Sequence, residues 1–308
     1  MKNNLLRTQL GKIDLLNPIT VASGTFSYDY NDLYDINQLG AIITKTITPE
    51  RKSGNPVPRL VETQSGLLNS IGLQNPGIDD FLKNEILRYK DIKCPLIISF
   101  SASTIAEFEM SLQKLEAYNQ DPDSVFISGY EVNVSCPNVE NEGLAFGVDA
   151  RVVYDLTSKL SNLTDKELII KLSPNVTDIA EIAKAAEDGG ATSLSLINTL
   201  LGMSIDWKTG RSNIKRGIAG YSGPAIKPVA LACVYKVANK VSIPLLAMGG
   251  ISSYEDVIEF IYAGASVVAI GTAQFPDPEL PIKIIDKLNN YCSSNHIKLL
   301  DLKKKIFF

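Results

Sequence analysis

The sequence predicts a (β/α)8 barrel, also called a TIM barrel, in which eight parallel strands alternate with helices. Short runs of apolar, β-branched residues recur along the 308 residues, and each is followed by a turn and then by helical periodicity. We count eight such runs, the number of strands that closes a barrel. A doubly wound sheet would need a G-x-G-x-x-G turn after an early strand, and the sequence has none. No linker divides the chain, so we expect one domain over residues 1–308.

The strands are expected to be continuous apolar runs, because strands of a barrel are buried on both faces. Residues 5–15 come first and alternate enough for a small N-terminal hairpin that closes the bottom of the barrel. The eight barrel strands follow at residues 19–22, 41–44, 96–99, 131–134, 168–172, 193–197, 245–248 and 267–270.

Helical periodicity fills the intervals between these strands. The helices are expected at residues 78–89, 105–118, 152–160, 179–187, 226–237, 254–262 and 280–291, with a short additional helix at 30–38. Ser252 and Glu255 have the spacing of a capping box at the start of one helix. Gly264 stands where the end of that helix favours a left-handed residue.

Composition excludes several classes of protein. Apolar residues make up 45% of the chain and charged residues 21%, which is typical of a globular domain. The 30 basic and 34 acidic residues give a net charge of −4, so a general nucleic-acid surface is not expected. No run is apolar enough for a signal peptide or a membrane helix, so we expect a cytoplasmic, unanchored protein.

Metal sites and histidine-based triads are not expected. The four cysteines are widely separated with no C-x-x-C pair, so this chain encodes neither a zinc site nor an iron–sulfur site. The one histidine, His296, lies near the C-terminus and is interpreted as a surface helix residue. We therefore expect no metal in this chain.

The active site of such a barrel lies at the C-terminal ends of its strands, so the loops there carry the most weight. Three connections, residues 45–77, 136–149 and 198–224, are long, and long loops in a compact domain are usually functional. Glycines follow the last two strands, at Gly249, Gly250 and Gly271, beside Thr272. One such pair would fit a simple tight turn equally well, but two adjacent glycine turns favour a phosphate site.

Three further residues at strand ends suggest chemistry. Lys45 and Lys171 interrupt apolar runs, and each is either an ion-paired lysine or a cation placed for an anionic ligand. Cys136 leaves the fourth strand into a long loop. An isolated cysteine is usually an inert buried residue. Here the position and the scarcity of histidine favour a thiolate that acts as a base.

Several motifs, in this order along nearly the whole chain, resemble those of the dihydroorotate dehydrogenase family. They are Lys45-Thr46-Ile47-Thr48-Pro49, Gly54-Asn55-Pro56 with Pro58-Arg59, residues 68–77, residues 133–138, Ile197-Asn198-Thr199 with Gly202-Met203, and residues 222–228. The resemblance implies a flavin mononucleotide (FMN) barrel that oxidises dihydroorotate to orotate in de novo pyrimidine (UMP) biosynthesis. It implies removal of a proton from C5 by Cys136 and hydride transfer from C6 to the flavin.

Within this family, a cysteine base marks the soluble class, whereas the membrane-associated class uses serine and carries an N-terminal helix. The soluble class has a fumarate-linked homodimeric branch and an NAD-linked branch. Residues 22–26 and 143–149 are more similar to the NAD-linked branch. That branch pairs its barrel with an electron-transfer subunit that carries FAD and a 2Fe-2S cluster. The resemblance thus implies a homodimer of barrels within a heterotetramer.

The resemblance also assigns roles to individual residues. It implies catalytic roles for Cys136 and Lys171. Flavin contacts are implied for Ser23, Lys45, Thr46, Asn133, Lys171, Ile197, Gly223, Gly249, Gly250, Gly271 and Thr272. Ser99 stands at a further flavin position where the family usually has asparagine, and its shorter side chain leaves open whether it reaches the flavin. Contacts to dihydroorotate or orotate are implied for Lys45, Asn69, Ser70, Ile71, Gly72, Leu73, Asn133, Asn138, Asn198 and Thr199.

Three alternatives remain open from the sequence. The first is a fumarate-linked dihydroorotate dehydrogenase. The second is a related flavin barrel that acts on another dihydropyrimidine or a different enone. The third is a phosphate-binding barrel without redox chemistry, which would be purified without yellow flavin absorbance.

Overall fold

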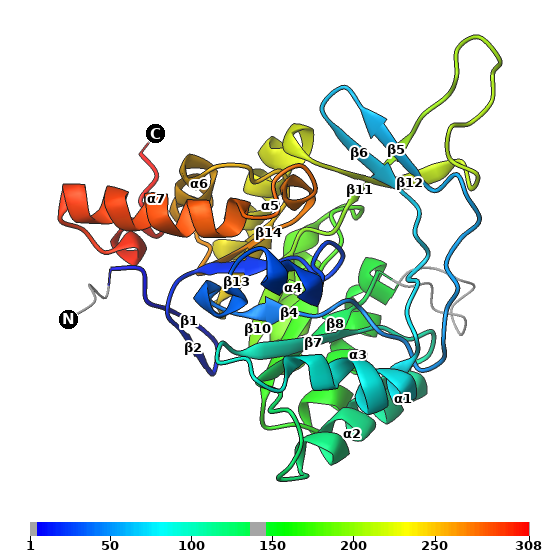
Figure 1. Ribbon diagram of the computed structural model, residues 1–308, viewed down its shortest axis with the longest axis horizontal. Coiled ribbons are helices and arrows are strands. Elements are labelled where there is room, and N and C mark those ends of the chain that lie inside the picture. Colours follow the sequence, from blue (N-terminus) through cyan, green and yellow to red (C-terminus); the bar gives the residue numbers. More distant parts are fainter. Residues whose placement is uncertain (1–4, 136–145, 308) are drawn as a thin grey trace.

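A computed structural model of the chain describes residues 5–135 and 146–307 and confirms the (β/α)8 barrel. Eight parallel strands form one sheet (Figure 1). Their order around the sheet is β3 (Ile19–Val21), β14 (Val267–Ile270), β13 (Leu245–Met248), β10 (Ser193–Leu196), β9 (Glu167–Lys171), β8 (Gly129–Asn133), β7 (Leu96–Phe100) and β4 (Ile42–Ile43). Each predicted strand is present, and the observed bounds differ from the predicted ones by two residues at most.

The barrel closes between β3 and β4, where the chain after β3 returns to the sheet. The backbone N–H of Gly40 donates to the carbonyl of Ile19 at 2.7 Å. The hydroxyl of Thr20 donates to the carbonyl of Ala41 at 2.8 Å. These two bonds join the edge strands, so the sheet has no open edge of the kind that invites aggregation.

The barrel interior is apolar at its bottom and polar toward the C-terminal ends of the strands. The antiparallel hairpin of β1 (Thr8–Leu10) and β2 (Ile13–Leu15) contributes to the apolar layer, as predicted. That layer consists of Leu10, Ile13, Leu15, Ala41, Ile43, Ile97, Ile169, Leu246, Met248, Val267 and Ala269. Side chains alternate along each strand, so residues two positions further on from this layer also face inward. The inward positions toward the top are polar at Ser99 and Lys171.

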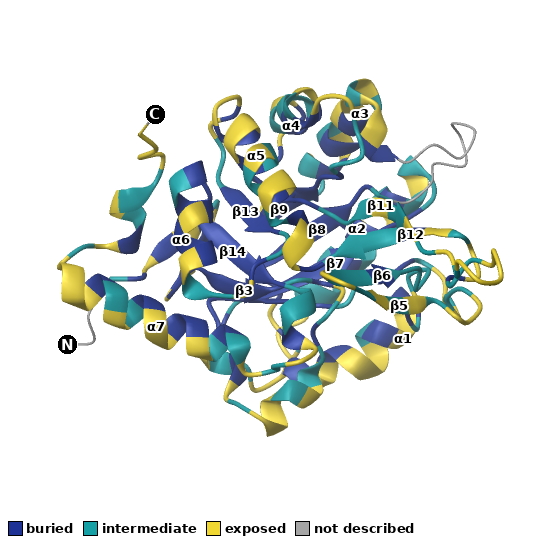
Figure 2. Cartoon of the chain, turned by 90° about the horizontal axis from the view of Figure 1, so that it is seen from above, coloured by how far each residue is buried: buried dark blue, intermediate teal, exposed yellow. Residues whose placement is uncertain are grey.

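The helices surround the sheet, with buried residues toward the strands and exposed residues outward (Figure 2). They are α2 (Ile105–Asn119), α3 (Ala150–Ser161), α4 (Ile179–Asp188), α5 (Lys227–Ala238), α6 (Tyr254–Ala263) and α7 (Leu280–Asn295). The predicted helix at 78–89 is a distorted one. It begins as α1 (Ile78–Asp80), continues as a π-helix over Phe81–Glu85 and ends as a 3-10 helix over Ile86–Tyr89. No described helix has the length and apolarity needed to cross a membrane.

Two local predictions are corrected by the structure. The short helix expected at 30–38 is two separate 3-10 turns, Tyr28–Asp32 and Ile36–Gln38. The carboxylate of Asp35 accepts from the N–H of Asn37 at 3.0 Å, which starts a new turn instead of continuing the first. The capping box of α6 lies one residue later than expected and uses Ser253 and Asp256. The C-terminal residue Gly264 is left-handed, as predicted, with φ 117.

Two of the long connections contain strands that the sequence did not predict. They form a four-stranded antiparallel sheet, in the order β11 (Leu200–Met203), β12 (Ile218–Ser222), β6 (Gly66–Asn69) and β5 (Leu60–Thr63). Figure 1 shows this sheet beside the mouth of the barrel, separate from the barrel strands. The third long connection, residues 136–149, is described only from residue 146 onward.

We expect the substitution Gly40→Ala to lower the free energy of unfolding by about 1–3 kcal/mol, the usual cost of overpacking. An added Cβ at Gly40 would lie 2.1 Å from the backbone carbonyl oxygen of Asn17, so the closure between β3 and β4 would have to shift. Gly24→Ala is the matched control, because a Cβ there meets no atom within 4 Å and should change stability by less than about 0.5 kcal/mol. Urea unfolding of both variants measures the difference, and equal midpoints would contradict the expectation.

Candidate active site

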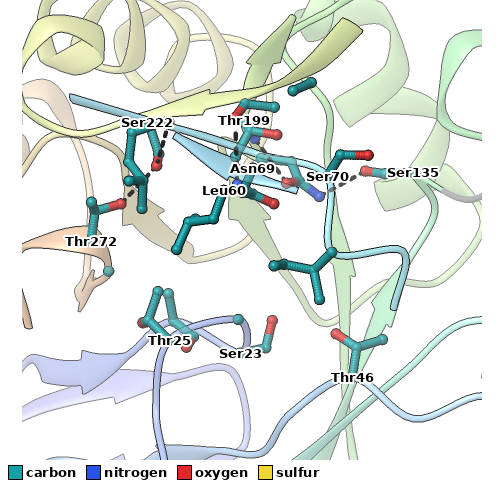
Figure 3. A pocket seen from close by; sticks show the side chains of 18 of the residues that line it. Ser23, Thr25, Thr46, Leu60, Asn69, Ser70, Ser135, Thr199, Ser222 and Thr272 are labelled. Carbon is teal, nitrogen blue, oxygen red and sulfur yellow. Dashed lines mark hydrogen bonds between the residues drawn. The ribbon is translucent and has the colours of Figure 1, made fainter. Parts of the chain in front are cut away.

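A cavity of about 1320 Å³ lies at the C-terminal ends of the barrel strands, covered by the small antiparallel sheet. Figure 3 shows polar side chains facing one another across it, with Ser23, Thr25 and Thr46 opposite Asn69 and Thr199. Most of the site residues expected from the sequence line this cavity. They are Ser23, Lys45, Thr46, Asn69, Ser70, Ile71, Gly72, Leu73, Asn133, Lys171, Ile197, Asn198, Thr199, Gly223, Gly249, Gly250, Gly271 and Thr272.

The charge of the cavity wall is positive. The charged side chains that line it in the described part of the chain are all cations, and no carboxylate is among them. The cations are Lys45, Lys52, Arg59, Lys171 and Arg216. Sequence reasoning gave no site role to Lys52, Arg59 or Arg216, which lie in the long connections and whose position could not be known before the loops were folded. Such a wall favours ligands that carry negative charge.

The two lysines at strand ends differ in their surroundings. Lys171 is 5% exposed, and its ammonium donates to the hydroxyl of Ser23 at 3.0 Å and lies 3.4 Å from the Glu131 carboxylate. An ammonium has three donors, so one is left for a ligand as far as the described residues go. Lys45 is half-buried, and burial together with the charge of Lys171 lowers the pKa of Lys45. Both effects disfavour the protonated form of Lys45, whereas an anion bound in the cavity would favour it and would be attracted by both lysines.

Gly249 and Gly250, just after β13, line the cavity and pack closely against other parts of the chain. Gly249 and Gly250 have φ 128 and 74, the left-handed region that glycine tolerates. A Cβ on Gly250 would lie 2.7 Å from the backbone nitrogen of Lys227 and 2.9 Å from the carbonyl of Gly223. The segment leads directly into α6, and Ser252, next to the N-cap Ser253 of that helix, also lines the cavity. Backbone N–H groups at the start of a helix are suited to phosphate.

A hydroxyl pair joins the barrel to the small sheet at this end of the cavity. The hydroxyl of Thr272, just after β14, donates to that of Ser222 at the end of β12 at 2.8 Å. Both residues line the cavity, and Figure 3 shows the contact. The bond holds the covering sheet against the end of β14, beside Gly250.

Amide side chains from three elements line another part of the cavity. Asn198 donates to the hydroxyl of Ser135 at 2.8 Å and to the side-chain oxygen of Asn133 at 3.4 Å. Asn69, from the small sheet, donates to the carbonyl of Gly220 at 3.4 Å. Amides both donate and accept, so this group can match the alternating C=O and N–H edge of a pyrimidine ring.

Ser99, for which the sequence left a flavin contact open, does not line the cavity. It is fully buried below the cavity wall. Its hydroxyl lies 2.9 Å from that of Thr46 and donates to Glu131 at 3.0 Å. Glu131 itself was inside a predicted strand but was given no role. The available signal was a carboxylate within an otherwise apolar run, which must find buried partners.

Cys136 and Asn138 lie outside the described residues. The other three cysteines are far from thiolate character. Burial raises the pKa of Cys94 to about 12 and also raises the pKa of Cys233 and of Cys292. None of these three lines the cavity. We therefore do not expect Cys94, Cys233 or Cys292 to act as the catalytic base.

Comparison with known proteins gives a consistent family likeness. The family model described as dihydroorotate dehydrogenase matches residues 5–292. A protein of Thermoanaerobacter pseudethanolicus is 46% identical over 295 residues, 95% of this chain and 95% of that protein. One from Fusobacterium nucleatum is 46% identical over 307 residues, 98% of each chain. One from Bacteroides thetaiotaomicron is 44% identical over 295 residues, 95% of each. All three are named dihydroorotate dehydrogenase B (NAD(+)), catalytic subunit.

Proposed function

The chain belongs to the dihydroorotate dehydrogenase family, and from this premise we propose that it oxidises dihydroorotate to orotate in de novo pyrimidine biosynthesis, passing the electrons to NAD. The observation that carries the proposal is the convergence of the family's motif residues on one cavity, whose charged lining residues in the described part of the chain are all cations. Dihydroorotate is a carboxylate with an amide ring, so it needs both the cations and the asparagines that meet there.

The cavity fits flavin mononucleotide by two observations. Gly249, Gly250 and Ser252 line it just before the N-cap of α6, and backbone at a helix N-terminus suits the phosphate. Its buried Lys171 has a donor left for a ligand among the described contacts, which suits a ring that gains negative charge when it is reduced. We propose that the flavin is held by Ser23, Lys45, Thr46, Asn133, Lys171, Ile197, Gly223, Gly249, Gly250, Gly271 and Thr272.

We propose that the chain's own residues bind the substrate and move its proton. Lys45 offsets the substrate carboxylate, while Asn69, Asn133, Asn138 and Asn198 hold the ring through its carbonyl and N–H groups. Residues 70–73 and Thr199, which line the cavity, supply the remaining contacts to the substrate. Cys136 takes the proton from C5. Flavin mononucleotide, when bound, supplies the acceptor for the hydride that leaves C6.

Electron transfer to NAD requires a second protein in this proposal. The relatives are named as catalytic subunits of an NAD(+) enzyme. The chain has no G-x-G-x-x-G turn for NAD and no cysteine spacing for a cluster. We propose a partner subunit with FAD and a 2Fe-2S cluster, assembled with a homodimer of barrels as a heterotetramer. We place the complex in the cytoplasm, where its nicotinamide acceptor is dissolved.

Anaerobic addition of dihydroorotate to the purified chain tests the substrate and the cofactor together. We expect the bound flavin to lose its yellow absorbance within one turnover and orotate to appear in equal amount. Dihydrouracil, which lacks the carboxylate, is the matched control. It should bleach the flavin far more slowly, because it has no negative charge to pair with the cationic side chains of the cavity. A colourless chain would favour a phosphate-binding barrel. A yellow chain that dihydroorotate does not bleach would favour another enone or dihydropyrimidine.

A further inference from the structure

Glu131 is a buried carboxylate beneath the cavity that the proposed function does not use. It lies in the middle of β8, and its side chain is fully shielded from solvent. Its Oε1 accepts from Ser99 at 3.0 Å and lies 3.4 Å from the Lys171 ammonium, while its Oε2 accepts from Ser195 at 3.0 Å. All these neighbours donate, and both oxygens accept.

The ion pair with Lys171 lies where solvent screens little. The Lys171 side chain is 6% exposed and that of Glu131 0%. In such surroundings a charge acts on its neighbours far more strongly than it would in water. The carboxylate therefore offsets the cation that the cavity presents to its ligand. Without Glu131, the full positive charge of Lys171 would face the cavity.

A hydrogen-bond chain carries the influence of Glu131 to a second cavity residue. Ser99 gives its only hydroxyl proton to Glu131, so the hydroxyl of Thr46, 2.9 Å away, must be the donor in the Thr46–Ser99 bond. Thr46 lines the cavity and therefore presents oxygen lone pairs, not a proton, to what binds there. Glu131 thus fixes both the charge at Lys171 and the hydrogen-bond polarity at Thr46.

We propose that Glu131 is a positioning residue that sets the reduction potential of the flavin. This inference rests on the proposed function, since it presumes that flavin occupies the cavity. Lys171 by itself favours the reduced, more negative flavin. Glu131 limits this preference by offsetting the lysine charge, so the reduced flavin can still pass its electrons onward. The residue contacts no ligand and acts through Lys171 and Thr46.

The test is the midpoint potential of FMN bound to the full chain, measured by equilibration with redox dyes. In Glu131→Gln we expect the ratio of reduced to oxidised flavin at a fixed potential to rise about tenfold, or about 30 mV for a two-electron couple. Glu131→Asp keeps the charge and should stay within about threefold of the wild type. Glu167→Gln is the matched control, because Glu167 is equally buried on the adjacent strand but contacts Lys12 and Ser193 instead of cavity residues.

Three outcomes would overturn the inference. One is an unchanged potential in Glu131→Gln, the second is an equal shift in Glu131→Asp, and the third is an equal shift in Glu167→Gln. If Glu131→Gln does not fold, the double variant with Lys171→Met leaves no charge unpaired, and its potential should exceed that of Lys171→Met alone. Equal potentials in those two variants would also overturn it. A wild-type chain that takes up no flavin would instead refute the proposed function itself.

Discussion

Replacing Cys136 with alanine is expected to slow flavin reduction by dihydroorotate by about 10² to 10⁴-fold, the usual contribution of a general base. Cys136 is the remaining candidate among the four cysteines, because burial raises the pKa of Cys94, Cys233 and Cys292. FMN should still bind, since its proposed contacts come from other residues. Stopped-flow absorbance of the anaerobic reaction measures the rate, and flavin fluorescence measures binding.

Two further variants sharpen this result. Cys136→Ser should shift the activity profile to higher pH, because a hydroxyl ionises much less readily than a thiol. Cys233→Ala is the control, since Cys233 is half-buried on α5 and does not line the cavity. It should reduce flavin at the wild-type rate. Near-normal flavin reduction in Cys136→Ala would contradict the assignment of Cys136 as the base. It would leave the assignment of FMN as the cofactor in place.

The barrel could be predicted from the sequence because its strands are buried on both faces. Continuous apolar runs such as Val267–Ile270 and Leu245–Met248 leave few alternatives, and both were predicted with their observed bounds. β8 was predicted two residues short at its start. Gly129 reads as a turn residue, but a Cβ there would lie 2.7 Å from the Cβ of Glu167 on β9. Its glycine serves close packing within the barrel, which a local pattern does not reveal.

The small antiparallel sheet could not be predicted in the same way. Its strands are partly exposed, with exposure that alternates along β5 and β11, and neither of these two strands contains a fully buried residue. Its central pairing joins Asn69 with Gly220, residues about 150 positions apart in the chain. Local periodicity carries no information about such a contact, so the segments were expected to be loops. The cations that this sheet and its flanking loops add to the cavity were missed for the same reason.

The candidate site was predictable where motif residues touch the cavity and unpredictable one layer below it. Lys171 and Gly250 were named from their positions at strand ends, and both line the cavity. For Ser99 the sequence left open whether the side chain reaches the flavin, and its hydroxyl bonds to Thr46 and Glu131. The sequence shows which residues end a strand. It does not show which inward side chains satisfy one another inside the barrel, and that depends on the register of four strands.

The isolated chain, loaded with FMN, is expected to pass electrons from dihydroorotate to artificial dyes but not to NAD. NAD would need its own site beside the flavin, and the chain lacks the glycine-rich turn that would bind it. Adding the proposed FAD and 2Fe-2S subunit should restore NADH formation, which absorbance at the nicotinamide band measures. FAD added without that subunit is the control and should not. Cys136→Ala should lose both activities, because the first half-reaction precedes either acceptor. NAD reduction by the chain alone, or reduction of fumarate as fast as of dyes, would assign the chain to a different branch without changing its substrate.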